Sequence, residues 1–406
     1  MRWVDPEGLV AALAARHSGV FWLDGAAASP RASVVGWLEP DEIALAFAPG
    51  EEPFGPTAQL LADLLPHERL VGWFGYAART DLPAQRAAGP VPDSLWMRAR
   101  RYLLFDHDRQ VMTPVGFDGD PVLPDPPPAA DRSTSAPDVS TWPMDAYTRA
   151  FDRVQRELAR GNTYETNLTY RVEVASDEPP LSVYRRLRRT NPAPYAAYLQ
   201  HDGVAVLSSS PERFARIDDG WIETRPIKGT TPRDPDPGVD AAQARLLTTD
   251  PRLRAENLIV TDLLRNDLST VCTPGTVLVP DLMRVESYAS VHQLVTTVRG
   301  RLRDGVGVVD AVRELSPAGS MTGAPKLRTM ELIADVESTP RGVYAGSLGW
   351  MAPHAADLAV VIRTLVHDGS RYVAGTGGGI TTGSEALAER EEAEHKLSRL
   401  LAALGA

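Results

Sequence analysis

A lysine held between proline and glycine residues is the side chain with the clearest chemical potential in this sequence. Lys228 lies in the segment PIKGTTPR, where Pro226, Gly229 and Pro232 restrict the backbone around the amine. A lysine among apolar neighbours can lose its proton and then act as a nucleophile or a base. The alternative is an ordinary solvated surface lysine. The segment itself leaves both interpretations open.

A predicted hairpin brings an acid towards this amine. The run DDG at 218–220 separates the strand-like segments ERFARI and WIETRPI, and glycine fits the left-handed position of a three-residue loop. Such a loop would set Glu212 opposite Pro226 and place Lys228 diagonally on the same face as Glu212. A two-residue turn would shift the register by one and put the acid and the amine on opposite faces.

Two further carboxylates share one face of a predicted C-terminal helix. In EREEAEHK, Glu389 and Glu392 are three residues apart and Lys396 follows four residues later. The preceding GTGGGITTG offers unhindered backbone N–H groups, which suit anionic ligand groups. Carboxylates beside such a cradle favour a bridging hard cation, and Mg²⁺ fits best. Glu256 is the candidate third ligand, and a solvated acidic helix face is the alternative.

A single arginine interrupts an apolar strand. Arg363 lies in DLAVVIRTLV, which is apolar on both faces. A buried guanidinium needs a carboxylate partner, which is either an internal Asp or Glu or an acidic group of a substrate. The sequence does not choose between the two.

These residues all fall in the larger of two regions. Residues 119–143 are rich in Pro, Asp and Ser and lack a hydrophobic period, which predicts an extended connector. Residues 1–118 alternate short apolar runs with Gly, Pro and Asp breaks, which predicts mostly strands behind one amphipathic N-terminal helix. Residues 144–406 form the predicted catalytic region.

The catalytic region mixes helical and strand periods. Tyr147, Phe151, Val154 and Leu158 recur at helical spacing, with Gly161 as the expected C-cap. The runs YAAYLQ, GVAVLSS, ERFARI and WIETRPI are divided by Asp-Gly turns, which predicts an antiparallel meander. Helical stretches follow in AENLIVTDLLRNDL, VVDAVREL and PKLRTMELIADVE. The predicted fold class is α+β with mainly antiparallel sheets.

The composition argues against several classes of function. The 406 residues are 43% hydrophobic and 23% charged, as in soluble globular proteins. A formal net charge of −11 argues against nonspecific binding to nucleic acid or to anionic lipid. The apolar runs fall short of the roughly 20 residues of a membrane span, and the N-terminal run lacks the features of a signal peptide. We therefore expect a cytoplasmic protein that acts on small molecules or on other proteins.

Seven motifs, taken in order, resemble those of the chorismate-utilising enzymes. They are SSSPERF, PIKGTTPR, AENLIVTDLLRND, SMTGAPKLRTMELI, IRTL, GGGI and EREEAEHK. The resemblance spans Tyr147 to Leu404 and is strongest to the aminodeoxychorismate synthase component I group, which is related to anthranilate synthase component I. It implies layered antiparallel sheets flanked by helices, with chorismate and Mg²⁺ bound inside the second region.

Two positions distinguish the members of this family. The resemblance implies that the lysine of PIKGT marks aminodeoxychorismate synthases, because anthranilate synthases carry alanine there. Isochorismate and salicylate synthases carry a lysine at the position of Glu165, where it activates water. Lys228 therefore favours the first activity, and Glu165 counts against the last two.

The family mechanism gives each motif a role in making 4-amino-4-deoxychorismate. Lys228, kept neutral by its surroundings, would add to the chorismate ring ortho to the carboxylate while Glu212 protonates the departing hydroxyl. Ammonia would then enter at the para carbon as Lys228 leaves. Mg²⁺ held by Glu256, Glu389 and Glu392 would fix the ring carboxylate. The residues expected to hold the rest of the substrate are Gly229, Ser320, Thr322, Tyr344, Arg363, Gly377, Gly379 and Lys396.

The resemblance also implies a partner protein that supplies ammonia. A class I glutamine amidotransferase needs a cysteine nucleophile, and Cys272 is the only cysteine in the chain. It lies in the turn-like stretch VCTPGT and is interpreted as a small buried hydrophobe. A separate glutamine amidotransferase subunit is therefore expected, with free ammonia as a poorer substitute.

Two residues depart from the family pattern. Gln293 stands where anthranilate synthases carry a histidine that assists pyruvate elimination, and His292 comes one residue early, on the opposite face of a strand. Leu253 replaces an acid often found three residues before Glu256, so weaker metal binding is expected.

The sequence leaves other functions open. They are an anthranilate or aminodeoxyisochorismate synthase large subunit, and a non-catalytic homologue that binds chorismate or carries the glutaminase. The predicted product could serve either folate or a specialised aminobenzoate pathway, because both begin with the same step.

Overall fold

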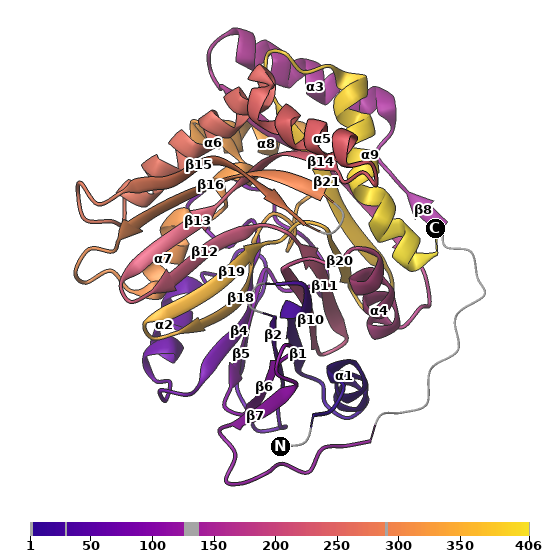
Figure 1. The fold of residues 1–406 in the computed structure, drawn as a ribbon, viewed down its shortest axis with the longest axis vertical. Helices are drawn as coiled ribbons and strands as arrows, with labels where there is room; N and C mark the ends of the chain where they lie inside the picture. Colours follow the sequence, from indigo (N-terminus) through magenta and orange to yellow (C-terminus); the bar gives the residue numbers. More distant parts are fainter. Residues whose placement is uncertain (1–2, 29–30, 126–137, 289–290, 406) are drawn as a thin grey trace.

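Two antiparallel sheets packed face to face form the centre of the molecule, with helices on both outer faces (Figure 1). This computed structural model describes residues 3–28, 31–125, 138–288 and 291–405. Residues 126–137 of the predicted connector lie outside the described residues. The predicted α+β class with mainly antiparallel sheets is confirmed, because every strand pair among the described residues is antiparallel.

The first sheet has eleven strands among the described residues. All but β8 follow one path, and β8 (Asp138–Ser140) pairs beside β9. The path runs through β17 (Gly323–Ala324), β9 (Glu165–Ala175), β21 (Tyr372–Ile380), β20 (Thr364–His367), β11 (Val204–Ser210), β10 (Tyr195–His201), β1 (Val20–Asp24), β2 (Ala32–Trp37), β6 (Tyr102–Asp106) and β7 (Val111–Val115).

The second sheet has ten strands in the described ranges. Its strand β15 (Leu278–Ser287) pairs with β16 off the main path. The path runs through β14 (Ile227–Pro232), β16 (Val291–Arg301), β13 (Trp221–Arg225), β12 (Arg213–Asp218), β19 (Ala355–Val360), β18 (Ser347–Ala352), β4 (Arg69–Phe74), β5 (Ser94–Ala99) and β3 (Ala44–Phe47).

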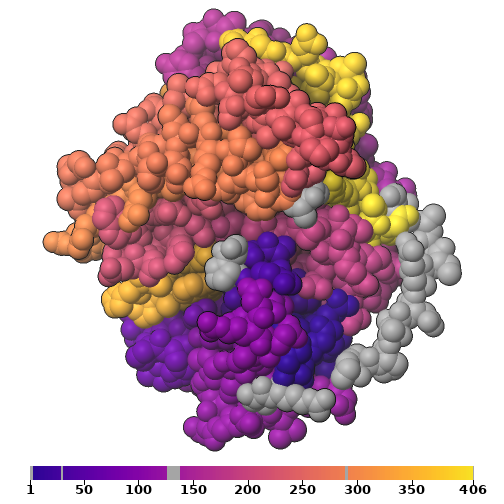
Figure 2. Space-filling view, in the orientation of Figure 1, coloured from indigo at the N-terminus to yellow at the C-terminus, as the bar shows by residue number. Residues whose placement is uncertain are grey.

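Strands from residues 1–118 continue both sheets. In the first sheet β1 pairs with β10, and in the second β4 pairs with β18. In the space-filling view the indigo and violet N-terminal residues cover the lower part of the molecule, below the salmon and orange residues (Figure 2). The regional boundaries at 118 and 144 stay a prediction, but the strands on either side of them belong to the same two sheets.

The helices cover the outer faces of the sheets. Those predicted near the N-terminus, from Tyr147, in the three later stretches and at the C-terminus are confirmed. Gly161, with a φ of 73°, follows the C-cap of α3. The helices and short 3-10 turns are α1 (Pro6–Ala14), η1 (Gly25–Ala27), α2 (Phe54–Ala62), α3 (Met144–Ala159), α4 (Pro180–Thr190), α5 (Pro237–Thr249), α6 (Pro251–Ser269), α7 (Val308–Leu315), η2 (Gly319–Met321), α8 (Lys326–Val336) and α9 (Ala386–Leu404).

Three helices, α2, α4 and α5, were not predicted. The prediction of a single helix in residues 1–118 is therefore wrong, because α2 lies there as well. Each of the three has proline in its first turn, and two of them have glycine there too. Proline in the first turn removes an N–H that has no helical partner in any case, so a residue that resembles a break is compatible with a helix start.

The core has one layer between the sheets and one on each outer face. Between the sheets, Phe21 and Leu199 of the first sheet pack with Trp73 and Leu348 of the second. Fully burying a side chain of this size contributes about 1.5–3 kcal/mol. The central layer therefore fixes the position of one sheet relative to the other.

The turn of the β12–β13 hairpin differs from the predicted one. Asp218 lies opposite Trp221, and the two turn residues at 219–220 have φ values of 49° and 72°. Both values are typical of a two-residue type I′ turn, which is favoured because its twist matches that of the strands. The predicted three-residue loop is therefore wrong.

A bulge in β12 nevertheless restores the expected register further along the hairpin. The pairing shifts by one residue between Arg213 and Arg216, so that Arg213 lies opposite Arg225. A bulge adds one residue to one strand and thereby cancels the one-residue shift that the shorter turn introduced. Glu212 and Pro226, the next residues outward, therefore take the corresponding positions that the three-residue loop would have given them.

Candidate active site

A buried ion pair joins the two sheets at the centre of the candidate site. Lys228 lies on β14 of the second sheet, and Glu165 is the first residue of β9 in the first sheet. Lys228 Nζ lies 2.5 Å from Glu165 Oε1, and the two side chains are only 14% and 4% exposed. The amine is therefore not a solvated surface lysine.

An irregularity in β14 accompanies the lysine. The pairing of β14 with β16 shifts register between Ile227 and Thr230. Gly229 in this segment has a φ of 97°, a left-handed conformation that strains any other residue. Such irregularities change the direction in which a neighbouring side chain points. Gly229, predicted to bind substrate, thus adjoins Lys228 at the interruption.

The charge of Lys228 differs from the expectation. Burial lowers the pKa of Lys228, but the negative carboxylates of Glu165, Glu256 and Glu212 outweigh burial and raise the pKa above its ordinary value. The expectation that the surroundings keep this amine neutral is therefore wrong, because the neighbours that matter are acids. A raised pKa favours the protonated amine, which must lose its proton before it can attack a carbon atom.

Glu212 is a buried acid with a different environment. It lies between β11 and β12, and Ser320 Oγ donates a hydrogen bond to Glu212 Oε1 at 2.7 Å. Burial raises the pKa of Glu212 to about 7, against the smaller lowering effects of the Ser320 hydrogen bond and of Lys228. Ser320, predicted to bind substrate, thus orients an acid that is partly protonated at neutral pH.

The three predicted metal ligands lie on two neighbouring helices and are paired with cations. Arg252 Nε lies 3.0 Å from Glu256 Oε1, and Arg252 Nη2 lies 2.8 Å from Glu389 Oε1. Lys396 Nζ lies 2.7 Å from Glu392 Oε1. As the side chains lie, no three Asp, Glu, His or Cys residues of the described ranges are grouped to hold a metal ion.

The chemistry of these donors nevertheless fits a hard cation. Glu389 is almost fully buried, and the positive group of Arg252 spans it and Glu256. Burial raises the pKa of Glu256 in spite of Lys228 and Arg252 nearby. Buried carboxylate oxygens are the ligands that Mg²⁺ prefers. The half-exposed Arg252 side chain lies between the two carboxylates, at a position where their negative charge favours a cation.

The glycine run forms strand β21 and must lack side chains for steric reasons. A Cβ on Gly379 would lie 2.3 Å from Glu165 Oε1 and 2.9 Å from Lys228 Nζ. A Cβ on Gly377 would lie 2.2 Å from the carbonyl oxygen of Leu168. The recorded pairing of β21 with β20 ends at Ala374, whereas its pairing with β9 continues to Ile380. The final residues of β21 therefore have one edge without a paired strand.

Arg363 has no carboxylate partner among the residues that the structure describes. Among the described residues, the one hydrogen bond of its guanidinium runs from Nη1 to the carbonyl oxygen of Lys396 at 3.4 Å. Burial and nearby Arg399 lower the pKa of Arg363. A largely buried guanidinium without an internal acid is suited to an acidic group of a ligand.

The remaining predicted substrate residues lie around the same strand. Lys396 Nζ donates to the carbonyl oxygen of Gly377 at 3.1 Å. Tyr344 packs against Gly375, where an added Cβ would lie 2.2 Å from the ring. The hydroxyl of Thr322 donates to the backbone at Ala318 or Gly319 and is fully buried. The role of Thr322 in binding substrate stays a prediction.

Two residues of the site were not predicted to belong to it. Glu165 was noted only as the residue that replaces a lysine, and its contact with Lys228 crosses between sheets. No spacing rule reports such a contact. Arg252 lies four residues before Glu256, a helical spacing typical of an ion pair, so this half of its bridge could have been predicted. The contact of Arg252 with Glu389 on another helix could not.

His292 and Cys272 have structural contacts. His292 is buried, with Nδ1 2.7 Å from Ser287 Oγ and Nε2 3.0 Å from Asp240 Oδ1. Cys272 is buried, and burial raises the pKa of its thiol to about 11. A thiol of this kind is not a thiolate at neutral pH and is a poor nucleophile.

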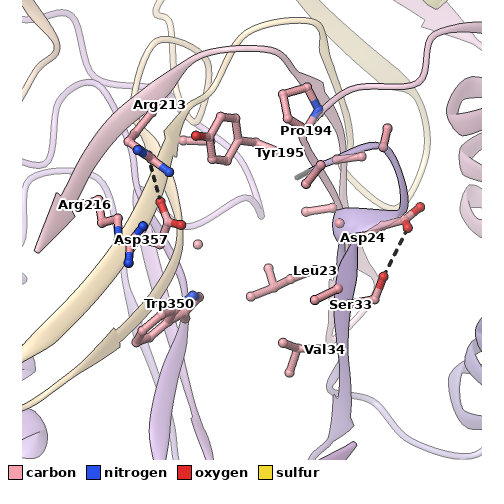
Figure 3. Close-up of a pocket in the computed structure, with 18 of the residues that line it drawn as sticks. Leu23, Asp24, Ser33, Val34, Pro194, Tyr195, Arg213, Arg216, Trp350 and Asp357 are labelled. Atoms are coloured by element: carbon pink, nitrogen blue, oxygen red, sulfur yellow. Dashed lines mark hydrogen bonds and ion pairs between the residues drawn. The ribbon is translucent and has the colours of Figure 1, made fainter. Parts of the chain in front are cut away.

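A large cavity of about 1190 Å³ lies elsewhere between the sheets. In Figure 3, Arg213 and Asp357 of the second sheet face Leu23 and Val34 of the first sheet across it. Arg213 Nε lies 3.4 Å from Asp357 Oδ1. None of the predicted site residues is among the described residues that line this cavity. Size therefore does not identify the chemical site in this molecule.

None of the helices within the described ranges combines the length and the apolar character that crossing a membrane requires.

Comparisons with known sequences find relatives along most of the chain. The family model of the chorismate binding enzymes matches residues 32–402. Aminodeoxychorismate synthase from Streptomyces griseus is 40% identical over 411 residues, which cover 95% of this chain and 56% of that protein. Aminodeoxychorismate synthase component 1 from Salmonella typhimurium is 37% identical over 351 residues, 82% of this chain and 75% of that protein. The chain spans about half the length of the Streptomyces griseus protein.

Solved structures share the fold. Anthranilate synthase component I from Streptococcus pneumoniae has a TM-score of 0.79 at 24% identity, over 91% of this chain and 92% of that chain. The menaquinone-specific isochorismate synthase from Escherichia coli has a TM-score of 0.78 at 20% identity, over 99% of this chain and 91% of that chain. These likenesses confirm the layered fold that the sequence motifs implied.

Proposed function

The chain belongs to the chorismate binding enzyme family, and we propose that it converts chorismate and ammonia to 4-amino-4-deoxychorismate. The observation that carries the proposal is the buried amine of Lys228, held in a site with Glu212 and Glu165. An amine that bonds to the ring ortho to the carboxylate occupies that carbon. The incoming nitrogen is then directed to the para carbon.

Lys228 supplies the nucleophile in this proposal. Its neutral Nζ forms a bond to the ring carbon ortho to the carboxylate, the ring double bonds shift, and the bond to the ring hydroxyl breaks. Ammonia then bonds to the para carbon, the double bonds shift back, and the bond to Nζ breaks. The two substitutions together exchange hydroxyl for amine at one carbon and regenerate Lys228.

Glu212 supplies the proton for the departing hydroxyl. Hydroxide is a poor leaving group, whereas water leaves readily once a neighbouring acid gives up its proton. The pKa of Glu212, raised to about 7 by burial, leaves a large fraction of this acid protonated near neutral pH. The hydrogen bond from Ser320 fixes the carboxyl group, and the proton returns to Glu212 from the ammonium of the product.

The cations beside β21 support binding of a substrate with two carboxylates. No carboxylate among the described residues pairs with Arg363, and Arg363 Nη1 donates a hydrogen bond to the carbonyl oxygen of Lys396. We expect these two cations and the backbone N–H groups of Gly377 and Gly379 to hold the carboxylates. Tyr344, Gly229 and Thr322 would then contact the ring and the enolpyruvyl arm.

A magnesium ion would be held by Glu256, Glu389 and Glu392. When bound, Mg²⁺ would supply positive charge next to the ring carboxylate and so orient the substrate. We expect Mg²⁺ to bind weakly for two reasons. Leu253 replaces an acid near the site, and Arg252 competes with the metal ion because it is paired with two of the three ligands.

Ammonia would come from a separate glutamine amidotransferase subunit. Cys272 is the only cysteine of the chain, and it is buried in a β-bridge to Leu302, where burial raises the pKa of its thiol. It therefore does not fit the nucleophile of a glutaminase. The relative from Salmonella typhimurium is named component 1, which is consistent with a second component.

Product analysis tests the proposed function. Purified protein is incubated with chorismate, Mg²⁺ and ammonium chloride, and products are separated and identified by mass spectrometry. We expect 4-amino-4-deoxychorismate from the native protein and none from K228A. Anthranilate as the main product, with K228A nearly as active, would instead identify an ortho-aminating synthase. Tight chorismate binding in calorimetry without any product would identify a non-catalytic homologue.

A further inference from the structure

Resting on the proposed function, we propose that Glu165 is a catalytic residue that takes a proton from Lys228 before attack and returns it afterwards. The ion pair indicates the need for such a residue, because a carboxylate in contact with a lysine favours the ammonium form, which has no free electron pair. Glu165 touches the reacting nitrogen atom at 2.5 Å, which is the distance of a strong charge-assisted hydrogen bond. The proton can therefore pass directly between them.

The geometry around Glu165 leaves its carboxylate free for this task. In the described part of the chain, the Glu165 carboxylate has a hydrogen bond only with Lys228. Thr163 bonds to the backbone oxygen of Glu165, not to its carboxylate. Gly379 provides the room, since a Cβ there would overlap both members of the pair. The glycine at position 379 of β21 is therefore what leaves space for the contact between Glu165 and Lys228.

The other acids that face Lys228 are engaged elsewhere. Glu212 accepts a hydrogen bond from Ser320, and its acid form is needed for the leaving group. Glu256 on α6 is paired with Arg252, and Glu392 on α9 is paired with Lys396. Both act on Lys228 through space, with no hydrogen bond or ion pair to its amine in the described ranges. Of the acids among the described residues, only Glu165 forms a hydrogen bond with Nζ.

The proton balance closes over one turnover. First the Lys228 ammonium gives a proton to the Glu165 carboxylate, which yields a neutral amine and a carboxylic acid. Nζ then bonds to the ring as a secondary ammonium, and later leaves with the electron pair of the breaking C–N bond as a neutral amine. Glu165 returns its proton to that amine. The net reaction consumes chorismate and ammonia and releases aminodeoxychorismate and water.

Replacement of Glu165 by glutamine tests this role. Glutamine keeps the size of the side chain but cannot store the proton, so Lys228 must lose it to solvent. For E165Q we expect kcat to fall by about 10²-fold at pH 7 with KM for chorismate changed by less than about threefold. The ratio of E165Q to native kcat should rise with pH, by about tenfold per unit, because solvent deprotonates the amine more readily as pH rises.

Two further variants make the result specific. E173Q is the matched control, because Glu173 lies on the same strand and pairs with Arg371 at the surface. E173Q should keep the native kcat, and the ratio of its kcat to the native kcat should not change with pH. E165D keeps a carboxylate one methylene further away, so we expect a fall in kcat of about tenfold and a ratio to native kcat that stays flat with pH.

The outcomes separate this inference from the proposed function. If the native protein makes no aminodeoxychorismate, the proposed function fails first. If the native protein makes it and E165Q keeps native kcat, or loses kcat with a ratio that does not change with pH, Glu165 is not the proton acceptor. If E165Q does not fold, a native kcat in E165D leads to the same rejection.

Discussion

Glu165 and Glu212 are both buried, yet their neighbours give them opposite tasks. Glu165 Oε1 lies 2.5 Å from the amine of Lys228. Glu212 accepts a hydrogen bond from Ser320, and burial raises the pKa of Glu212 to about 7. Two acids in such different environments are a common arrangement for moving one proton in and another out.

The raised pKa of Glu212 predicts the pH dependence of activity. The acid form is the active one, so kcat should fall as pH rises through about 7. In E212Q this decline should disappear, and kcat at pH 6 should drop by about 10²–10³-fold. Steady-state kinetics from pH 5.5 to 9 measures both effects. The variant E223Q, in the neighbouring strand, should keep the native decline; the same decline in E212Q would point to another titrating group.

For single residues, the sequence identified candidate site residues but not the side chains that they contact. The prolines and glycine around Lys228 left both a surface lysine and a buried amine open, and the contact with Glu165 from the other sheet decides its surroundings. The partner of Arg363 could not be predicted either. A single arginine in an apolar strand is compatible both with an internal acid and with an acidic group of a substrate. The structure shows that no carboxylate among the described residues pairs with Arg363, although Glu392 acts on it through space.

Two strand irregularities set the geometry of the site. The bulge in β12 compensates for the short turn at 219–220 and returns the hairpin to the register that brings Glu212 near Lys228. The irregularity in β14 lies at Gly229, beside the lysine. Bulges leave weak signals in a single sequence, so the sequence pattern predicted the strands and the near approach but gave the wrong turn.

The close packing around β21 predicts that even a methyl group, added by a glycine-to-alanine substitution, lowers kcat strongly. In G379A the added Cβ would lie 2.3 Å from Glu165 Oε1, so the ion pair must move. A displacement of this size at a reacting group can cost about 10²-fold, and we expect such a fall in kcat. Because the clash involves side-chain ends, we expect the melting temperature to change by only a few degrees. Kinetics and thermal unfolding monitored by circular dichroism measure the two effects.

Gly383 offers the matched control. A Cβ there would have no atom within 4 Å, and the residue lies just beyond the same strand. G383A should keep native kcat and stability. Native kcat in G379A would show that the ion pair tolerates displacement and is not held by β21.

The whole molecule depends on strands from both regions. Residues 1–118 contribute β1 beside β10 and β4 beside β18, and the large side chains between the sheets come from both regions. Each such side chain contributes about 1.5–3 kcal/mol. Because native proteins are stable by only about 5–15 kcal/mol, loss of several removes the stability of the rest.

Truncation tests this shared stability. A chain of residues 144–406 should not unfold cooperatively and should lack near-ultraviolet circular dichroism, although it holds all the predicted site residues. By contrast, the 406-residue chain, cut at a protease site inserted in the predicted connector, should stay as one particle in gel filtration. A stable, active fragment 144–406 would show that the N-terminal strands are not required for the stability of the two sheets.

The contact of Lys228 with Glu165 also determines how the enzyme could be inhibited. Drugs that capture a lysine through an aldehyde or an activated ester require a free amine, and here the amine is in a 2.5 Å contact with a buried carboxylate. A molecule that presents its own anion to Lys228, or its own cation to Glu165, would exploit the resting charges directly. Competitive mimicry of the paired charges is thus a better route to selectivity than covalent capture.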